Sequence, residues 1–265
     1  MIPAGTVTYT LGTAPVTGIG YSFNQDELNE CLAGPVAEKV FDDEGNEDIA
    51  AFLGGLVDTQ FAQDNVRKAL SRTKEPEDWR VGEALAESYL TFHRGCFFPW
   101  PDSRDERKAG SSLPGADLVG FQNDGQTVRL AFGEVKTSSE ARYPPGTTYG
   151  RTGSKQQLED LRDDQSIRDQ LVLYLARRAI LGAPWQQQYR RAATRYFSDS
   201  ADVRVFGLMV RDVDPHQDDW RARATKLAKG CPESMVVELL ALYLPAGSIA
   251  TLSQKVLGSR KGGAS

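Results

Sequence analysis

The chain has 265 residues, of which 40% are hydrophobic and 25% are charged, and its formal net charge is −5. This length can bury a full hydrophobic core, and the composition is that of an ordinary globular protein. No run reaches the ~18 apolar residues of a membrane helix, the start lacks a secretory-signal pattern, and three scattered cysteines argue against a disulfide framework or a CxxC zinc site. We therefore expect a cytoplasmic protein with no membrane association.

The charge is unevenly distributed along the chain. Residues 1–76 contain five Lys and Arg against twelve Asp and Glu, whereas residues 142–195 contain ten against five. A basic half can contact the phosphates of a nucleic acid while an acidic half faces elsewhere. The alternative is that both segments are ordinary solvated surfaces.

The first quarter of the chain combines strand and helix patterns. Residues 6–23 are rich in β-branched and aromatic residues with Gly and Pro, which predicts one or two short strands. Residues 46–72 carry apolar residues at helical spacing and end near a charged turn at 74–78. We expect residues 1–76 to form an acidic N-terminal α+β accessory region.

An amphipathic helix is predicted over residues 78–93. Val81, Leu85, Tyr89 and Phe92 recur at helical spacing and define one apolar stripe. Glu83 and Glu87 lie four residues apart on an adjoining face.

A β-hairpin is the clearest structure that the sequence predicts. After a short strand in CFFPWP (96–101) and a charged loop over 102–114, two β-branched and aromatic runs at 116–121 and 127–137 flank the turn sequence NDG. This arrangement is typical of two antiparallel strands joined by a tight turn.

The remaining chain alternates helical and strand patterns after a Gly- and Pro-rich loop over 138–153. Helices are predicted at 154–164, 166–182 and 217–229, and buried strands at 203–213 and 234–245. We therefore expect an α/β fold with a mixed central sheet flanked by helices. Its core should span residues 77–250, with a helix end and a flexible tail over 251–265.

The hairpin gathers a set of residues suited to metal chemistry. Glu134 and Lys136 are two apart and project from the same face of their strand, and Asp117 on the neighbouring strand can reach Glu134. Adjacent carboxylates repel unless a cation neutralises them, and hard oxygen ligands favour Mg²⁺ or Mn²⁺. The carbonyl of Val135 can point at the same ion, and a lysine beside it can orient an attacking water.

A Glu-x-Lys triplet alone also occurs as an ordinary surface pair. Here the triplet lies in a largely apolar hairpin, between residues such as Leu130, Phe132 and Val135 and the partner strand's Leu118 and Val119. Charged groups in such surroundings require compensation, which a metal ion provides. The alternative is an ordinary structural hairpin, which predicts that Asp117 and Glu134 lie far apart.

Three ordered sequence blocks resemble the PD-(D/E)xK nuclease superfamily. They are GEALAESYL (82–90), PGADLVGF (114–121) and LAFGEVKT (130–137), and they look closest to the Holliday-junction-resolvase-like branch. The resemblance implies a restriction-endonuclease-like fold and Mg²⁺-dependent hydrolysis of DNA phosphodiester bonds, with Mn²⁺ as a substitute. It also implies a homodimer, because many relatives use two sites to cut two strands.

The resemblance assigns a role to each matched residue. Asp117 and Glu134 become metal ligands, together with the Val135 carbonyl, and Lys136 becomes the water-activating lysine. Glu83 becomes the helix carboxylate that completes the metal site, although Glu87, one turn later, competes for this role.

Further candidate site residues lie in the helix predicted at 154–164 and in the loop at 138–153 that precedes this helix. In several exonuclease members of the superfamily this helix adds a glutamine, here Gln157 or its neighbour Gln156. Lys155, Arg151 and Tyr149 are candidate nucleic-acid contacts. The loop that contains Tyr143, Tyr149 and Arg151 is either a substrate-gating flap or an insertion, and its aromatic residues either stack on bases or pack the loop down.

Several functions are compatible with this sequence. The acidic balance favours a nuclease subunit of bacterial antiviral defence that depends on a helicase or ATPase partner, by analogy with other defence systems. Alternatives are a repair, recombination or restriction-type endonuclease acting alone, and a catalytically silent nuclease-fold binding module. DNA or RNA substrates, and endo- or exonuclease action, fit the residues equally.

Overall fold

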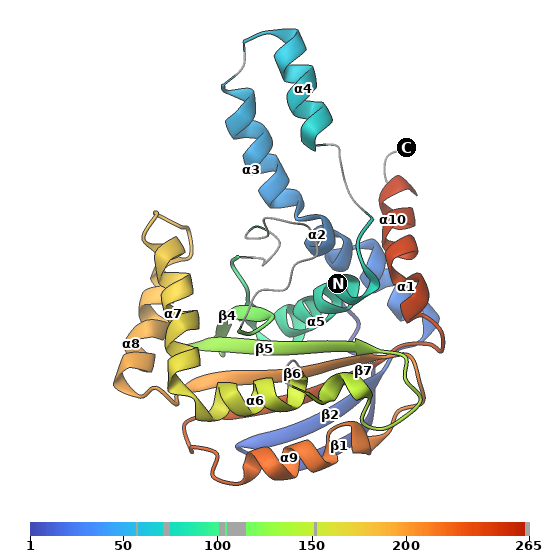
Figure 1. The fold of residues 1–265 in the computed structure, drawn as a ribbon, viewed down its shortest axis with the longest axis vertical. Coiled ribbons are helices and arrows are strands. Elements are labelled where there is room, and N and C mark those ends of the chain that lie inside the picture. The colour runs from blue at the N-terminus through green and yellow to red at the C-terminus, as the bar shows by residue number, and fades with distance from the viewer. Residues whose placement is uncertain (57, 71–74, 101–103, 105–114, 151–152, 263–265) are drawn as a thin grey trace.

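A mixed β-sheet forms the centre of the protein (Figure 1). The computed structural model describes all residues except 57, 71–74, 101–103, 105–114, 151–152 and 263–265. The described residues form a seven-stranded sheet with the order β1-β2-β7-β6-β5-β4-β3. The strands are β1 Thr6–Thr13, β2 Val16–Ser22, β3 Cys96–Phe97, β4 Leu118–Asn123, β5 Val128–Ser138, β6 Val203–Arg211 and β7 Val236–Tyr243.

The direction of the strands changes at both sides of the sheet. β2, β7, β6 and β5 run parallel to one another, whereas β1 pairs antiparallel with β2, and β4 pairs antiparallel with β5 and β3. Helices cover both faces, so the expected α/β fold with a mixed, helix-flanked sheet is confirmed at this level.

Two helical layers enclose the sheet, each over its own buried apolar cluster. The first layer comprises α1 Gln25–Ala33, α2 Pro35–Phe41, α5 Asp78–Arg94 and α10 Leu252–Gly262. The second comprises α6 Ser154–Asp163, α7 Gln165–Ala179, α8 Gln186–Ser198 and α9 Arg221–Ala228. Three single 3₁₀ turns among the described residues are η2 Gly146–Thr148, η3 Gln217–Asp219 and η4 Ile249–Thr251. No helix in the described parts of the chain combines the length and apolar character that crossing a bilayer requires.

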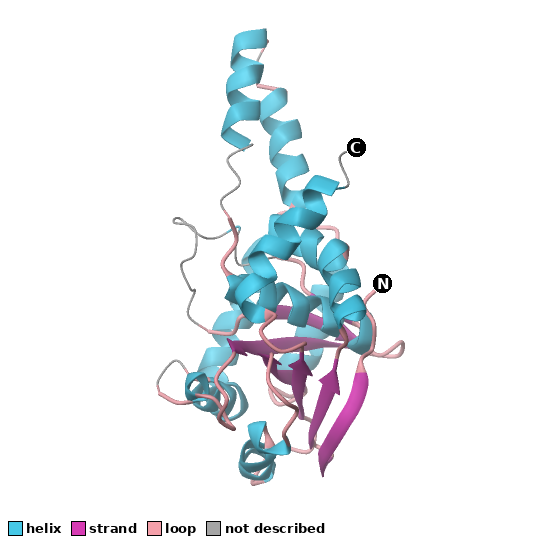
Figure 2. Cartoon of the chain, turned by 90° about the vertical axis from the view of Figure 1, so that its right-hand side faces the viewer, coloured by secondary structure: helices cyan, strands magenta, loops and turns pink. Residues whose placement is uncertain are grey.

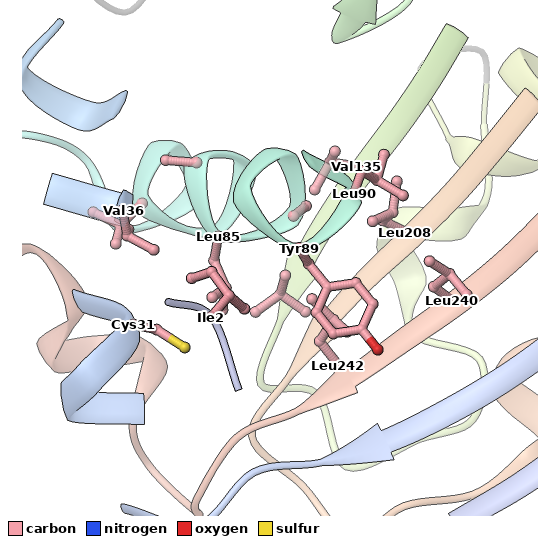
Figure 3. Close-up of a cluster of buried hydrophobic side chains, with 14 of the residues drawn as sticks. Ile2, Cys31, Val36, Leu85, Tyr89, Leu90, Val135, Leu208, Leu240 and Leu242 are labelled. Atoms are coloured by element: carbon pink, nitrogen blue, oxygen red, sulfur yellow. The ribbon is translucent and has the colours of Figure 1, made fainter. Parts of the chain in front are cut away.

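Helix α5 lies across β5, β6 and β7 and is the centre of the first layer (Figure 3). Val81, Leu85 and Tyr89 are at most 1% exposed, as their helical spacing predicts. Phe92 does not belong to this stripe, because it lies on the outer side of the helix and is 48% exposed. Gly95 ends the helix with a positive φ of 63° and donates its N–H to the carbonyl of Leu90.

The N-terminal region is part of the same sheet. β1 and β2 extend it beyond β7, with Val16 opposite Val237, and α2 packs on α5. The expected boundary at residue 76 therefore does not separate two sheets.

The helical segment predicted over 46–72 consists of two helices, α3 Asp43–Gly54 and α4 Gln60–Leu70. The break follows two glycines, Gly54 and Gly55, which have low helix propensity; residues 57, 71 and 72 lie outside the described part. The two helices form a hairpin that projects away from the sheet (Figure 2). Four of its large apolar residues are exposed, namely Ile49, Phe52, Leu56 and Phe61, whereas Leu53 and Val66 are partly buried.

The C-terminal expectation requires a correction. The sequence predicts a helix end followed by a flexible tail over 251–265, but α10 takes up most of this segment and continues to Gly262. Leu252 and Val256 are fully buried against the first layer, and this anchorage extends the helix. Residues 263–265 lie outside the described part.

Buried and exposed apolar residues should contribute very differently to the free energy of unfolding. Replacing Leu85 by Ala removes a buried side chain and should lower the free energy of unfolding by about 2–5 kcal/mol. Phe52→Ala, on the projecting hairpin, should change it by less than about 0.5 kcal/mol. Urea denaturation of both variants measures the difference; a comparable loss in Phe52→Ala would mean that the hairpin is packed.

Candidate active site

The register of the β4–β5 hairpin brings the predicted carboxylates together. Leu118 pairs with Gly133, so Asp117 lies opposite Glu134 one residue further along. Leu130 and Phe132 belong to the apolar cluster beneath α6–α9, whereas Ala131 and Val135 belong to the cluster beneath α5. By this alternation Glu134 and Lys136 project from the α6–α9 face.

Asp117 and Lys136 contact the strand around Glu134 directly. Oδ2 of Asp117 accepts a hydrogen bond of 2.7 Å from the backbone N–H of Val135. Because the N–H and C=O of a strand residue point to the same side, the Val135 carbonyl also points toward β4 rather than β6. Nζ of Lys136 lies 2.5 Å from Oε1 of Glu134. The three predicted side chains thus form one group, contrary to the ordinary-hairpin alternative.

Glu134 is the most constrained member of this group. Its side chain is 0% exposed, and neither carboxylate oxygen has a partner of hydrogen-bond geometry among the described residues. The ion pair with Lys136 is therefore its principal compensation. Burial, together with the charge of Asp117, raises the pKa of Glu134 to about 9.

Burial and neighbouring charge also shift the other two groups. Burial raises the pKa of Asp117, although Lys136 and the Val135 N–H act in the opposite direction. Burial alone would lower the pKa of Lys136, but the carboxylates of Glu134 and Asp117 outweigh it, so the net shift is upward. Lys136 therefore stays protonated and provides a fixed positive charge.

Both glutamates of helix α5 lie near this group. Glu83, Glu87 and Asp117 line the same small cavity of about 50 Å³, but it is the charge of Glu83 that raises the pKa of both Glu134 and Lys136. Glu87 is instead paired with Lys39 of α2 at 2.6 Å. The structure therefore favours Glu83 over Glu87 as the helix carboxylate of the site.

Close packing fixes the distance between α5 and the end of β5. A Cβ atom added at Gly82 would overlap the side chain of Thr137. The glycine of the GE pair thus allows α5 to approach β5 with Glu83 directly beside the contact.

Helix α6 begins beyond the end of β5 and covers the other side of the site. Gly207, opposite Glu134 on β6, lies beneath this helix, because a Cβ there would be 2.8 Å from Leu158. Gln156 donates to Asp160, whereas Oε1 of Gln157 is buried and has no hydrogen-bond partner among the described residues. Gln157 is therefore the better of the two glutamine candidates, although no described hydrogen bond joins it to Glu134.

The loop after β5 is anchored to the protein. Arg211 is fully buried and donates to the carbonyls of Ser138, Glu140 and Arg142 at 2.8–2.9 Å. Tyr143 stacks on His216 with its ring centroid 4.8 Å away. Of the two expectations for Tyr143, packing of the loop is the one observed.

Two of the predicted nucleic-acid contacts, Tyr149 and Lys155, lie together at the end of this loop. Tyr149 is 51% exposed and has Arg142 and Lys155 over its ring at 5.8 and 5.9 Å. Arg151, the third predicted contact, lies outside the described residues.

The donor set of the group suits a hard divalent cation. The carboxylates of Asp117 and Glu134 and the carbonyl of Val135 are oxygen ligands of the type that Mg²⁺ prefers. Both Glu134 oxygens lack a partner of hydrogen-bond geometry among the described residues, whereas Asp117 accepts from the Val135 N–H. Within the described residues, however, no three His, Cys, Asp or Glu side chains are grouped as a metal site. Glu83 is thus near Asp117 and Glu134 without joining them as a third ligand.

Two residues that shape the site were missed in the sequence. Lys39 lies far from Glu87 in the chain, and no pattern links them. Arg211 had a detectable signal, because it is a charged residue that ends an otherwise apolar strand run.

No protein-family model matches the chain, and no curated protein matches it in sequence.

The raised pKa of Glu134 predicts a pH-dependent stability without divalent metal. The unfolded chain releases this proton near the ordinary pKa of 4.5, whereas the folded protein retains it until about 9. Between these values the unfolded state binds fewer protons, so the free energy of unfolding falls as pH rises, by up to about 1.4 kcal/mol per pH unit from this group. Glu134→Gln should remove that contribution.

Urea denaturation in EDTA between about pH 5.5 and pH 8.5 measures both slopes. The wild-type protein should lose stability more steeply than Glu134→Gln. Parallel pH dependences would show that Glu134 ionises normally in the folded protein.

Proposed function

We propose that the protein is a metal-dependent nuclease that hydrolyses phosphodiester bonds in DNA, with a restriction-endonuclease-like core. The observation that carries the proposal is the fully buried Glu134, opposite Asp117 and paired with Lys136 at 2.5 Å. The mixed, helix-flanked sheet and the three ordered sequence blocks support it.

The electrostatics of the group favour a role for a cation. Two carboxylates that share a low-dielectric site cannot both remain ionised without further positive charge, and a single lysine supplies only one charge. In the proposed site Asp117, Glu134 and the carbonyl of Val135 hold Mg²⁺, which Mn²⁺ replaces. When bound, the ion polarises the phosphoryl group and stabilises the leaving oxygen.

The protein's own residues have distinct roles in this proposal. The Val135 N–H holds the Asp117 carboxylate in place. Lys136 keeps its proton on Nζ and stabilises negative charge on the attacking water and the phosphate. Glu83 tunes both neighbours through its charge, and Gln157 is a positioning candidate whose amide oxygen lacks a hydrogen-bond partner within the described structure.

A charge argument supports regulated rather than autonomous cleavage. A net charge of −5 opposes binding to a polyanion. We therefore propose a nuclease subunit of bacterial antiviral defence, loaded or licensed by a helicase or ATPase partner. Repair, recombination or restriction-type cleavage by the chain alone is the alternative, and rapid cutting by the isolated protein at physiological salt would favour it.

The first functional test compares plasmid cleavage by wild type, Glu134→Gln and Lys136→Met in Mg²⁺ and in Mn²⁺. Both variants should lose at least about 100-fold in rate, because each removes charge stabilisation at the reacting phosphate. Glu30→Gln, at an exposed position of α1, is the control and should cut at the wild-type rate.

A measurement of metal binding distinguishes a weakly active nuclease from a catalytically silent nuclease-fold binding module. Calorimetric titration with Mn²⁺ should show binding that Asp117→Asn abolishes. If the wild-type protein binds no divalent metal and cuts no DNA, the catalytically silent alternative is correct.

A second test separates the two glutamates of α5. Glu83→Gln should reduce cleavage about tenfold or more, because it removes a charge that acts on the site. Glu87→Gln should lower stability through the loss of its ion pair with Lys39 but leave the rate per folded molecule nearly unchanged. The reverse order of activities would assign the role to Glu87.

A further inference from the structure

A large groove lies between the projecting hairpin and the turn that joins α7 to α8. It has a volume of about 840 Å³ and is lined by residues of α2, α3, the segment after β3 and the α7–α8 turn. Its floor is aromatic, with Phe97, Phe98, Trp100 and Trp185. Trp100 lies between the guanidinium groups of Arg104 and Arg178, at 5.1 and 5.2 Å.

Exposed apolar side chains lie on the two elements that enclose this groove, the α7–α8 turn and the hairpin that begins with α3. Ile180 and Leu181, on the α7–α8 turn, are 73% and 83% exposed, and Leu181 lines the groove itself. Phe52 and Leu56 of the opposite hairpin are 68% and 65% exposed. Large apolar residues that gather at one exposed place mark an interaction surface.

The hairpin side of the groove is acidic. Glu38, Asp42, Glu44, Glu47 and Asp48 line it, and the helix that carries most of them, α3, contains no basic residue. Asp42 is neutralised by Arg104 at 2.7 Å. Glu38, Glu44, Glu47 and Asp48 are exposed to solvent. An occupant must therefore bring positive charge to this side and apolar groups to the floor.

We infer that this groove binds a basic amphipathic helix of a partner protein. Such a helix places its apolar face on Phe97, Trp100 and Leu181 and its Lys or Arg residues against Glu44 and Glu47. α3 has 12 residues and thus extends for about 18 Å. A partner helix of similar length covers both the groove and the apolar residues along the hairpin, which a small molecule does not.

A second copy of this chain fits the groove less well. Three described helices carry basic residues without an acidic one, namely α8, α9 and α10. Each packs apolar side chains into its own core, for example Ala192, Leu227 and Val256. Of these three helices α8 also shows a large exposed apolar side chain, Phe197, but a single such residue is not the apolar face that the groove requires.

The groove also reaches the candidate active site. Lys39, Phe98 and Trp100 line both this groove and the small cavity that contains Glu83 and Asp117. A bound helix therefore lies beside the catalytic group, where it can influence access to it. The binding interaction itself does not depend on the proposed nuclease activity.

A direct binding measurement tests the inference. The probe is a fluorescein-labelled 14-residue helical peptide of Leu and Lys at amphipathic spacing, compared with the same peptide containing Glu in place of Lys. By fluorescence anisotropy the basic peptide should bind the full chain and the acidic peptide should not. The double variant Glu44→Lys/Glu47→Lys should weaken binding about tenfold or more, and so should Phe52→Ser/Leu181→Ser.

A matched control distinguishes the groove from general attraction between opposite charges. Glu30→Lys/Asp214→Lys makes the same change in net charge at exposed positions outside the groove and should bind within about twofold of wild type. Equal weakening in this control, or equal binding of the acidic peptide, would overturn the inference. Concentration-dependent dimerisation in light scattering that Phe52→Ser abolishes would identify a second copy as the occupant instead. Circular dichroism verifies that each variant is folded.

Discussion

The burial of Glu134 opposite Asp117 is the constraint on which the candidate site depends. A carboxylate inside a sheet and beneath a helix opposes folding unless positive charge lies close to it. Lys136 supplies one such charge from the same strand, and the Val135 N–H holds the second carboxylate in place. The arrangement lowers the stability of the metal-free protein, which is the usual property of a site selected for binding or chemistry rather than for folding.

The surrounding architecture keeps this unfavourable group in a defined geometry. Gly82 lets α5 approach β5 and places Glu83 near the carboxylates. On the opposite face of the sheet, Gly207 lets α6 approach β6 closely. Arg211 fastens the loop that leaves β5 through three backbone carbonyls. The rigid elements around the site are therefore α5, α6 and this anchored loop, and together they restrict the approach of any substrate.

The β4–β5 hairpin and the pairing of its carboxylates could be predicted from the sequence, because short-range patterns determine them. The NDG turn and the period of two in the flanking runs determine the β4–β5 register, and through it the encounter of Asp117 with Glu134. Contacts between distant segments, such as Lys39 with Glu87, leave no local pattern. The apolar spacing in residues 46–72 predicted helices correctly, but spacing defines only a stripe. Whether another element covers that stripe depends on the rest of the chain; α3 and α4 contact each other, yet Ile49, Phe52 and Phe61 stay exposed.

The position of the N-terminal hairpin in the sheet has a consequence for biosynthesis. β2 leaves the ribosome long before its parallel neighbour β7, since Val16 pairs with Val237. Until β7 emerges, β2 has only β1 as a partner, and an isolated two-stranded hairpin is marginally stable. The central sheet therefore closes only after β7 has been made. Such long-range pairing folds slowly and leaves strand edges open to aggregation during synthesis.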